Sequence, residues 1–276
     1  MSGLADVEPR MTGAVRLRDG VQLAFSMFGT GTRPQRATLI HSLALDRGVW
    51  SQVVPHLVDE ADVLTFDCRG HGASGTGTPD FTTEQLADDL AELLDALGWS
   101  NTLVAGCSMG GAVAQQFAAS HRDRVRGSVF IDTTAWYGPE APKTWRERAD
   151  KARTDGFGEL LPFQLARWFG EDYAQANKAV VDSLTKTFLA NDLDAYGASC
   201  RLLGDADLRP IATQIAQPVA VVVGSEDYAT PPEMARELAD SVNGSLTVLS
   251  GAKHLTPLER SAEIAKVIID TLEQDG

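Results

Sequence analysis

Short apolar runs alternate with longer amphipathic stretches along most of the chain. The first two runs, residues 14–17 and 21–28, flank Asp19-Gly20, a dipeptide typical of tight hairpin turns. Runs of this length predict buried strands, whereas the amphipathic stretches between them predict helices. The alternation therefore predicts an α/β protein that opens with an antiparallel hairpin and continues as a mostly parallel sheet flanked by helices. The other six predicted strands are residues 37–40, 63–66, 102–105, 125–131, 219–223 and 246–249.

Two of the predicted helices carry start signals. Thr82-Thr83-Glu84-Gln85 is a capping box, and an apolar stripe from Leu86 to Leu97 follows it. Thr230-Pro231-Pro232-Glu233 predicts a second capping box, with proline at the first helical position. The apolar spacing from Ile264 to Leu272 predicts the last helix.

The pattern changes between residues 134 and 211, where helix-forming stretches replace the β-like runs. A helical insertion that cannot join the sheet must pack on top of it, so we predict a cap domain at 134–211. The core domain is then 1–133 together with 212–276. The cap holds many aromatic side chains, which are either cap core or the lining of a pocket: Trp136, Tyr137, Trp145, Phe157, Phe163, Trp168, Phe169, Tyr173, Phe188 and Tyr196.

The net charge of −14 at pH 7 argues against nucleic acid as a partner, because a polyphosphate would be repelled. No apolar stretch approaches the roughly 20 residues that a membrane-spanning helix needs. The segment Met1 to Thr12 lacks the apolar centre of a secretory signal. Cys68, Cys107 and Cys200 are too widely spaced for a disulfide framework or a zinc site. We therefore expect a cytoplasmic protein with no metal and no membrane association.

Gly106-Cys107-Ser108-Met109-Gly110 carries the strongest chemical signal in the chain. It follows the predicted strand 102–105 and precedes a helical run, which is the strand–turn–helix context that a Gly-x-Ser-x-Gly motif requires. Such a turn raises the serine hydroxyl above the sheet, where an adjacent base can activate it. The motif predicts Ser108 as a nucleophile. Cys107 is the alternative, but it lies off the apex of the turn and is better explained as a small packed side chain.

A serine nucleophile needs a histidine base and an acid that orients the imidazole. His254 follows the strand at 246–249, in a loop that can return over the carboxyl edge of the sheet. Asp227 follows the strand at 219–223 and gives the chain order serine, acid, histidine. Glu226 and Asp132 are competing acids, since each also follows a predicted strand.

Two main-chain N–H groups should stabilise a developing oxyanion. The residue after the nucleophile, Met109, supplies one, and Leu43 in the loop after residues 37–40 supplies the other. Four further residues are expected to contact the substrate: His41, Ser42, Trp136 and Trp145.

These motifs, together with Asp67-Cys68-Arg69-Gly70-His71-Gly72, resemble the α/β-hydrolase superfamily. Within it the chain is similar to the 3-oxoadipate enol-lactone hydrolases of aromatic catabolism. The similar segments include His41-Ser42-Leu43, Asp132-Thr133-Thr134-Ala135, Asp227-Tyr228-Ala229-Thr230 and Ala252-Lys253-His254-Leu255. The resemblance implies an eight-stranded α/β-hydrolase fold that hydrolyses a lactone or small carboxylic ester through an acyl-enzyme, without a metal or organic cofactor.

An enol-lactone carries a carboxylate, so the resemblance also implies a cap arginine that faces the pocket. The candidates, each of which could instead be a solvated helix charge, are Arg146, Arg148, Arg153, Arg167 and Arg201. Other reactions remain open, because pocket shape and not the triad selects the scissile bond. A carbon–carbon bond hydrolase or an acyltransferase would use the same triad. A small-molecule receptor that keeps the fold without turnover is a third hypothesis.

Overall fold

The computed structural model describes residues 7–274. The part of Met1 to Thr12 that precedes residue 7 lies outside the described residues. Eight strands form one sheet in the order β1-β2-β4-β3-β5-β6-β7-β8. Their bounds are β1 Met11–Arg16, β2 Gln22–Phe28, β3 Arg36–Ile40, β4 Asp62–Phe66, β5 Thr102–Cys107, β6 Val125–Ile131, β7 Val219–Gly224 and β8 Ser245–Leu249.

Only β2 runs against its neighbours, since it pairs antiparallel with both β1 and β4, and the remaining pairs are parallel. The opening hairpin pairs Arg16 with Gln22 across the turn that contains Asp19 and Gly20. The central strands β4, β5 and β7 are buried along their whole length, as expected when helices cover both faces of a sheet. The predicted α/β fold with an eight-stranded, mostly parallel sheet is confirmed.

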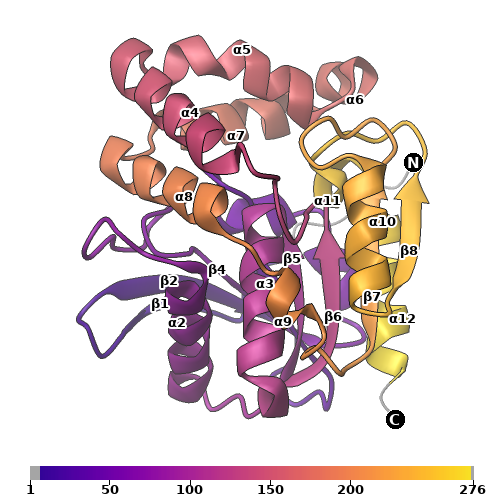
Figure 1. Ribbon diagram of the computed structural model, residues 1–276. Coiled ribbons are helices and arrows are strands. Elements are labelled where there is room, and N and C mark those ends of the chain that lie inside the picture. The colour runs from indigo at the N-terminus through magenta and orange to yellow at the C-terminus, as the bar shows by residue number, and fades with distance from the viewer. Residues whose placement is uncertain (1–6, 275–276) are drawn as a thin grey trace.

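Helices cover both faces of the sheet (Figure 1). In this view α2, α3 and α10 lie in front of the strands and α12 lies behind, where α1 packs against it. The helical bounds outside the β6–β7 connection are η1 Arg47–Trp50, α1 Val54–Leu57, α2 Thr83–Ala96, α3 Met109–Ser120, η2 Arg122–Arg124, α10 Pro232–Ser241, α11 Thr256–Glu259 and α12 Ser261–Glu273.

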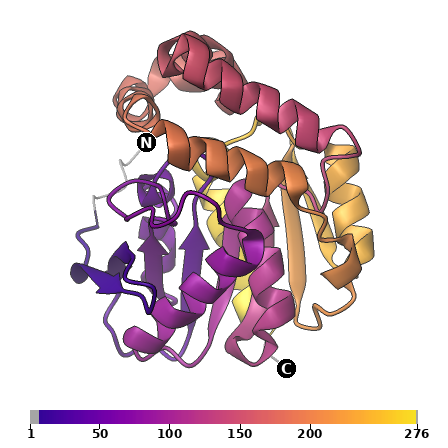
Figure 2. The same ribbon diagram turned by 60° about the vertical axis from the view of Figure 1, so that its left-hand side comes forward.

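Most of the chain between β6 and β7 forms a layer of helices above the carboxyl edge of the sheet, as Figures 1 and 2 both show, whereas its last helix, Arg209–Ala212, lies lower, against α3. Phe157, Phe188, Trp168 and Tyr196 pack edge to face in the middle of this layer, with ring centroids 5.1–5.5 Å apart. The division at residues 134 and 211 stays a prediction. The helices in this segment are α4 Ala141–Asp155, α5 Phe157–Trp168, α6 Glu171–Ala176, α7 Lys178–Leu189, α8 Leu193–Asp205 and α9 Arg209–Ala212.

The two predicted capping boxes have different outcomes. Thr82 caps α2, because its side chain accepts a hydrogen bond from the Gln85 N–H. In the second, proline occupies the first helical position as predicted, since α10 begins at Pro232, but the capping box is wrong: Pro231 is the N-cap, and Thr230 lies outside the helix. Instead of accepting from a helix N–H, the Thr230 hydroxyl donates to the Asp227 carboxylate at 2.8 Å, and a bond to an ionised acceptor is the stronger of the two.

Over residues 7–274, no helix combines the length and apolar character needed to cross a bilayer. In the same part of the chain, no group of three or more His, Cys, Asp or Glu side chains is arranged to hold a metal ion. Cys68, Cys107 and Cys200 are buried free thiols.

Two glycines allow α3 to start directly against the sheet. A Cβ atom at Gly110 would lie 2.2 Å from the Ile40 carbonyl oxygen at the end of β3. A Cβ atom at Gly106 would lie 2.0 Å from the carbonyl oxygen of Gly110. Both distances are far below van der Waals contact, so only glycine permits this approach of main chains. The contact fixes the residue between them, Ser108, above the carboxyl edge of the sheet.

We expect Gly110→Ala to lower the free energy of unfolding by about 1–3 kcal/mol, because the added methyl group must push α3 away from β3. Urea unfolding followed by circular dichroism measures the effect. Gly158→Ala is the matched control, since a Cβ at Gly158 meets nothing within 4 Å. Equal stability of the two variants would contradict the packing argument.

Candidate active site

Ser108 occupies a strained turn between β5 and α3. Its φ of 55° and ψ of −113° lie outside the regions that L-residues favour, at a cost of about 1–3 kcal/mol. The surrounding main chain holds this geometry, since the Ser108 carbonyl accepts from the N–H groups of Gly111 and Ala112 at 2.9 and 3.1 Å. The Thr133 hydroxyl donates to the same carbonyl at 2.8 Å. The turn is therefore fixed from α3 and from the end of β6.

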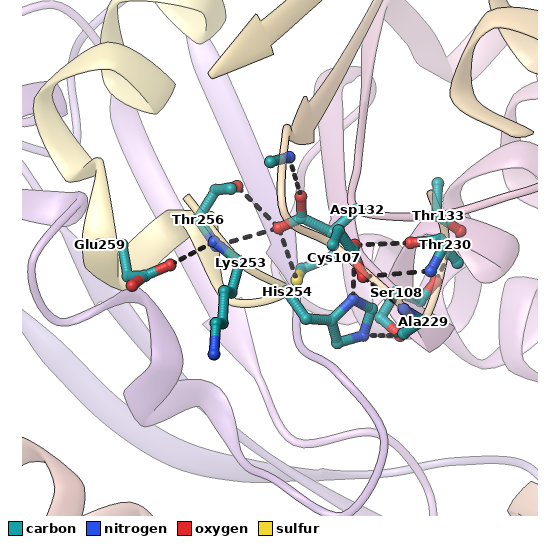
Figure 3. A network of polar contacts seen from close by, with 12 residues as sticks. Cys107, Ser108, Asp132, Thr133, Ala229, Thr230, Lys253, His254, Thr256 and Glu259 are labelled. Atoms are coloured by element: carbon teal, nitrogen blue, oxygen red, sulfur yellow. Dashed lines mark hydrogen bonds and ion pairs between the residues drawn. The ribbon is translucent and has the colours of Figure 1, made fainter. Parts of the chain in front are cut away.

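His254 joins Ser108 to Asp227 (Figure 3). The Nε2 atom of His254 lies 3.0 Å from the Ser108 Oγ, and its Nδ1 lies 2.8 Å from the Asp227 Oδ2. All three side chains are buried beneath the cap layer. If Nδ1 carries the proton and donates to Asp227, Nε2 is free to accept from the serine hydroxyl.

The Asp227 carboxylate is held in its ionised form. Its Oδ1 accepts from the N–H groups of Ala229 and Thr230 at 2.7 and 3.1 Å. Burial raises the pKa of Asp227, but the charge and hydrogen bond of His254 and the Thr230 hydrogen bonds outweigh it and leave the pKa below its usual range. Glu226, the competing acid, is exposed, whereas the buried Asp227 supplies the carboxylate that contacts the His254 Nδ1.

Asp132, the other competing acid, is fully buried and contacts the loop of His254 instead of its ring. Its Oδ2 accepts from the Thr256 N–H at 3.0 Å and the Thr256 hydroxyl at 2.7 Å, and its Oδ1 accepts from the Gly224 N–H at 3.2 Å. Burial and the charge of Asp227 raise the pKa of Asp132 well above its usual value. The carboxyl therefore ties β6 to β7 and to the His254 loop.

A cavity of about 30 Å³ lies directly over Ser108. Ser42 and Leu43 line it from the loop after β3, and Met109 begins α3 beside it. Leu43 therefore lies beside Ser108 at the cavity, and the oxyanion roles of the Leu43 and Met109 N–H groups stay a prediction. Gln164, Arg167 and Trp168 of α5 line the same cavity, so this helix covers the serine.

A second cavity of about 190 Å³ adjoins the first. Five residues line both: Tyr137, Trp145, Arg148, Arg167 and Ala229. Trp145 therefore lines both cavities, and its contact with a substrate stays a prediction. The larger cavity leads away from Ser108 along the start of α4, where Glu140 and Thr144 line it.

Two of the five candidate cap arginines, Arg148 and Arg167, face these cavities. Burial and the positive charge of Arg148 lower the pKa of Arg167, with an opposing contribution from Asp227. Arg148 donates to the Tyr196 hydroxyl at 2.8 Å and lies over the Trp145 ring. Two like charges close together in a partly dry pocket favour the binding of an anion between them.

The other three arginines lie elsewhere. Arg146 is exposed on α4. Arg153 forms an ion pair with Asp194, and Arg201 with Asp80, both on the outer surface. These side chains are the solvated helix charges that the sequence left as an alternative.

Two expected substrate contacts are wrong. The ring of His41 is fully buried behind the cavity, where its Nε2 accepts from the Cys68 N–H at 2.9 Å and its Nδ1 lies 2.8 Å from the Ser42 carbonyl. Trp136 forms a β-bridge with Asp207, and the Arg209 guanidinium lies 3.6 Å from its ring centroid. His41 therefore shapes the loop that carries Ser42, and Trp136 anchors the start of the cap.

Tyr137 and Gln164 are pocket residues that the sequence did not single out as site residues. Tyr137 interacts with Ser108, and burial is the main cause that raises its pKa, so its hydroxyl stays protonated. Gln164 is buried on α5 yet lines the cavity over Ser108. In the sequence, Gln164 is the one polar residue in the apolar run from Leu160 to Ala166, and this interruption is the signal that could have identified it.

Comparison with known proteins matches residues 38–261 to the α/β-hydrolase fold family. The chain therefore belongs to this family, and the prediction of an α/β-hydrolase enzyme is confirmed. It is 29% identical to 3-oxoadipate enol-lactonase 2 of Acinetobacter baylyi over 240 residues, which cover 87% of this chain and 89% of that protein.

Solved structures extend the similarity. The enol-lactonase from Burkholderia xenovorans LB400 superposes with a TM-score of 0.88 at 32% identity, over 95% of this chain and 100% of that one. A thermophilic esterase from Thermogutta terrifontis, in a malate-bound structure, gives a TM-score of 0.86 at 28% identity over 96% and 98% of the two chains. The predicted resemblance to enol-lactone hydrolases is thereby confirmed.

His71 should make the protein lose stability in mild acid. Burial, with a contribution from His41, lowers the pKa of His71 to about 3. Between about pH 6.5 and 4.5 the unfolded chain takes up a proton that the folded one does not bind, so the free energy of unfolding should fall by about 2–3 kcal/mol. Urea unfolding at several pH values measures this slope. His71→Gln should flatten it, and His56→Gln on α1 is the control; equal slopes in both variants would contradict the assignment.

Proposed function

We propose that this α/β-hydrolase is a serine hydrolase with Ser108 as nucleophile, His254 as general base and Asp227 as the orienting acid. The observation that carries the proposal is the hydrogen-bonded chain from Ser108 through His254 to Asp227, with distances of 3.0 and 2.8 Å. The strained turn at Ser108 supports it, because such strain persists where the surrounding structure aims a reactive group. The contacts of Asp132 with Thr256 and Gly224 support Asp227 as the acid, because they occupy the Asp132 carboxylate away from the His254 ring.

The reaction follows from this arrangement. His254 takes the proton of Ser108 as the oxygen attacks the substrate carbonyl, and ionised Asp227 stabilises the imidazolium. The N–H groups of Leu43 and Met109 stabilise the oxyanion of the tetrahedral intermediate. His254 then protonates the departing oxygen, and an acyl-enzyme remains. A water that His254 deprotonates attacks this ester, releases the acid and restores Ser108.

The substrate is a lactone or small carboxylic ester whose acyl part carries a carboxylate, with an enol-lactone as the leading candidate. The support comes from the pair Arg148 and Arg167, which line both cavities beside Ser108. A bound carboxylate would offset their mutual repulsion and accept charge-assisted hydrogen bonds. The similarity to two enol-lactonases supports the lactone in particular. The cytoplasmic location predicted from the sequence stays a prediction.

Ser108→Ala should reduce hydrolysis of the preferred lactone or ester by about 10⁶-fold, because removing the nucleophile removes the acyl-enzyme route. The measurement is a panel of lactones and short esters, an enol-lactone included, tested with wild type and variant. Cys107→Ala is the matched control and should keep its activity. Hydrolysis that survives in the Ser108→Ala protein would refute the nucleophile assignment.

Arg148→Gln and Arg167→Gln should raise KM for a carboxylate-bearing substrate by roughly 10- to 100-fold, the value of one or two charge-assisted hydrogen bonds. KM for a neutral ester of similar size should change less than about threefold, since it makes no such bonds. Arg153→Gln, on the outer surface of α4, serves as the control. Equal effects on charged and neutral substrates would argue against a carboxylate site.

A further inference from the structure

The loop that carries His254 is attached to the cap as well as to the sheet. On the cap side, the His254 N–H donates to the Arg167 carbonyl and the Leu255 N–H donates to the Trp168 carbonyl, each at 3.2 Å. The Lys253 ammonium donates to the Ala166 carbonyl at 2.7 Å. The carbonyls in the last turn of a helix have no N–H partner within the helix. Here the His254 loop supplies those partners to the last three residues of α5.

The carboxylate of Glu259 adds two hydrogen bonds to the contact between the His254 loop and the cap. Its Oε2 accepts from the Lys253 N–H at 2.6 Å, directly before His254, and its Oε1 accepts from the Gly170 N–H at 2.7 Å, directly after α5. The Glu259–Lys253 bond and its separation from the serine side of His254 are visible in Figure 3. A carboxylate can accept from two main-chain donors at once, whereas an amide side chain at this position has only one oxygen to offer.

The sheet holds the other side of the same loop. Asp132 binds Thr256, two residues after His254, through its main-chain N–H and its hydroxyl. The main chain around His254 is therefore hydrogen-bonded on one side to Asp132, at the end of β6, and on the other to the end of α5. The side chain of Arg167 lines the cavity over Ser108, while its own carbonyl accepts from His254.

We propose that Glu259 is a positioning residue, which fixes His254 against Ser108 by joining its loop to residues 166–170 of the cap. This rests on the proposed function of Ser108, His254 and Asp227. Glu259 does not line either cavity and does not touch the triad side chains. Its loss should therefore alter the reaction step and leave substrate binding unchanged.

Glu259→Gln tests the proposal with a side chain of the same size. A misplacement of about 1 Å in a catalytic group can cost about 100-fold in rate, so the loss of one of two bonds should lower kcat about tenfold. KM for the same ester should stay within about twofold, because the lining of the cavity is unchanged. Glu263→Gln on the exposed face of α12 is the matched control and should match wild type.

Lys253→Met and Lys253→Arg form a second pair. Methionine removes the donor to the Ala166 carbonyl, whereas arginine keeps one. The methionine variant should lose activity in kcat, and the arginine variant should recover it. Far-UV circular dichroism and thermal unfolding check that each variant is folded. The Lys253 variants test whether the joint between the His254 loop and the cap matters for the reaction step. If the Glu259→Gln protein does not fold, Gly170→Pro decides the role of Glu259: it removes the N–H that donates to the Glu259 Oε1, and the φ of −66° at Gly170 suits proline. Its kcat should fall while KM stays unchanged, and an unchanged kcat would overturn the proposal.

A fluorophosphonate probe separates this proposal from the proposed function, because it reports the reactivity of Ser108 without a matching substrate. Wild type that labels at Ser108 but hydrolyses no ester or lactone would refute the proposed reaction, and the labelling rates of the variants would still test Glu259. Variant rates equal to wild type, or a change in KM alone, would overturn the positioning role. Wild type that neither labels nor hydrolyses would overturn both.

Discussion

The close contact of main chains where α3 meets β3 and β5 is the constraint on which the site depends. Gly106 and Gly110 allow backbone atoms to approach at distances that any Cβ would prevent. The contact forces Ser108 into a left-handed conformation, and the Thr133 hydroxyl and the first N–H groups of α3 keep it there. A packed interface thus supplies the energy that a strained residue needs.

The parallel sheet brings the remaining groups to this point. Parallel strands end at one edge, so the loops after β3, β5, β6, β7 and β8 meet above it. Asp132 uses that proximity, since one buried carboxyl contacts main-chain groups at the end of β7 and after β8. Asp132 thus joins the segments that carry Asp227 and His254 to the end of β6, the strand that lies next to β5 and Ser108.

Two positive side chains line the cavities beside Ser108, although the whole chain is acidic. The net charge is −14, yet the cavities beside Ser108 hold the paired guanidinium groups of Arg148 and Arg167. Surface acids act on them through water and salt, which screen charges over about 10 Å, whereas the two arginines act on a ligand at contact distance. Overall acidity therefore does not exclude an anionic ligand when the pocket supplies its own positive charge.

The predictions from sequence were wrong where a side chain had two possible sets of contacts. Thr230 matches a capping box, but the nearby carboxylate of Asp227 is a better partner for its hydroxyl. His41 and Trp136 lie beside predicted pocket segments, yet their side chains turn away, to Cys68 and to Arg209. Adjacency along the chain places a residue at an edge of the sheet, and only packing determines the direction of its side chain.

Local patterns were enough to predict the strand and helix alternation, the hairpin at Asp19-Gly20, and the serine turn, because each depends on periodicity and glycine within a short segment. They also limited the candidates for the acid of the triad to three residues, and the candidates for a pocket arginine to five. Only the folded chain shows that Asp227 and not Asp132 faces His254, and that Arg148 and Arg167 face the cavity. Those choices depend on hydrogen bonds and packing between segments far apart in the chain, which no local pattern encodes.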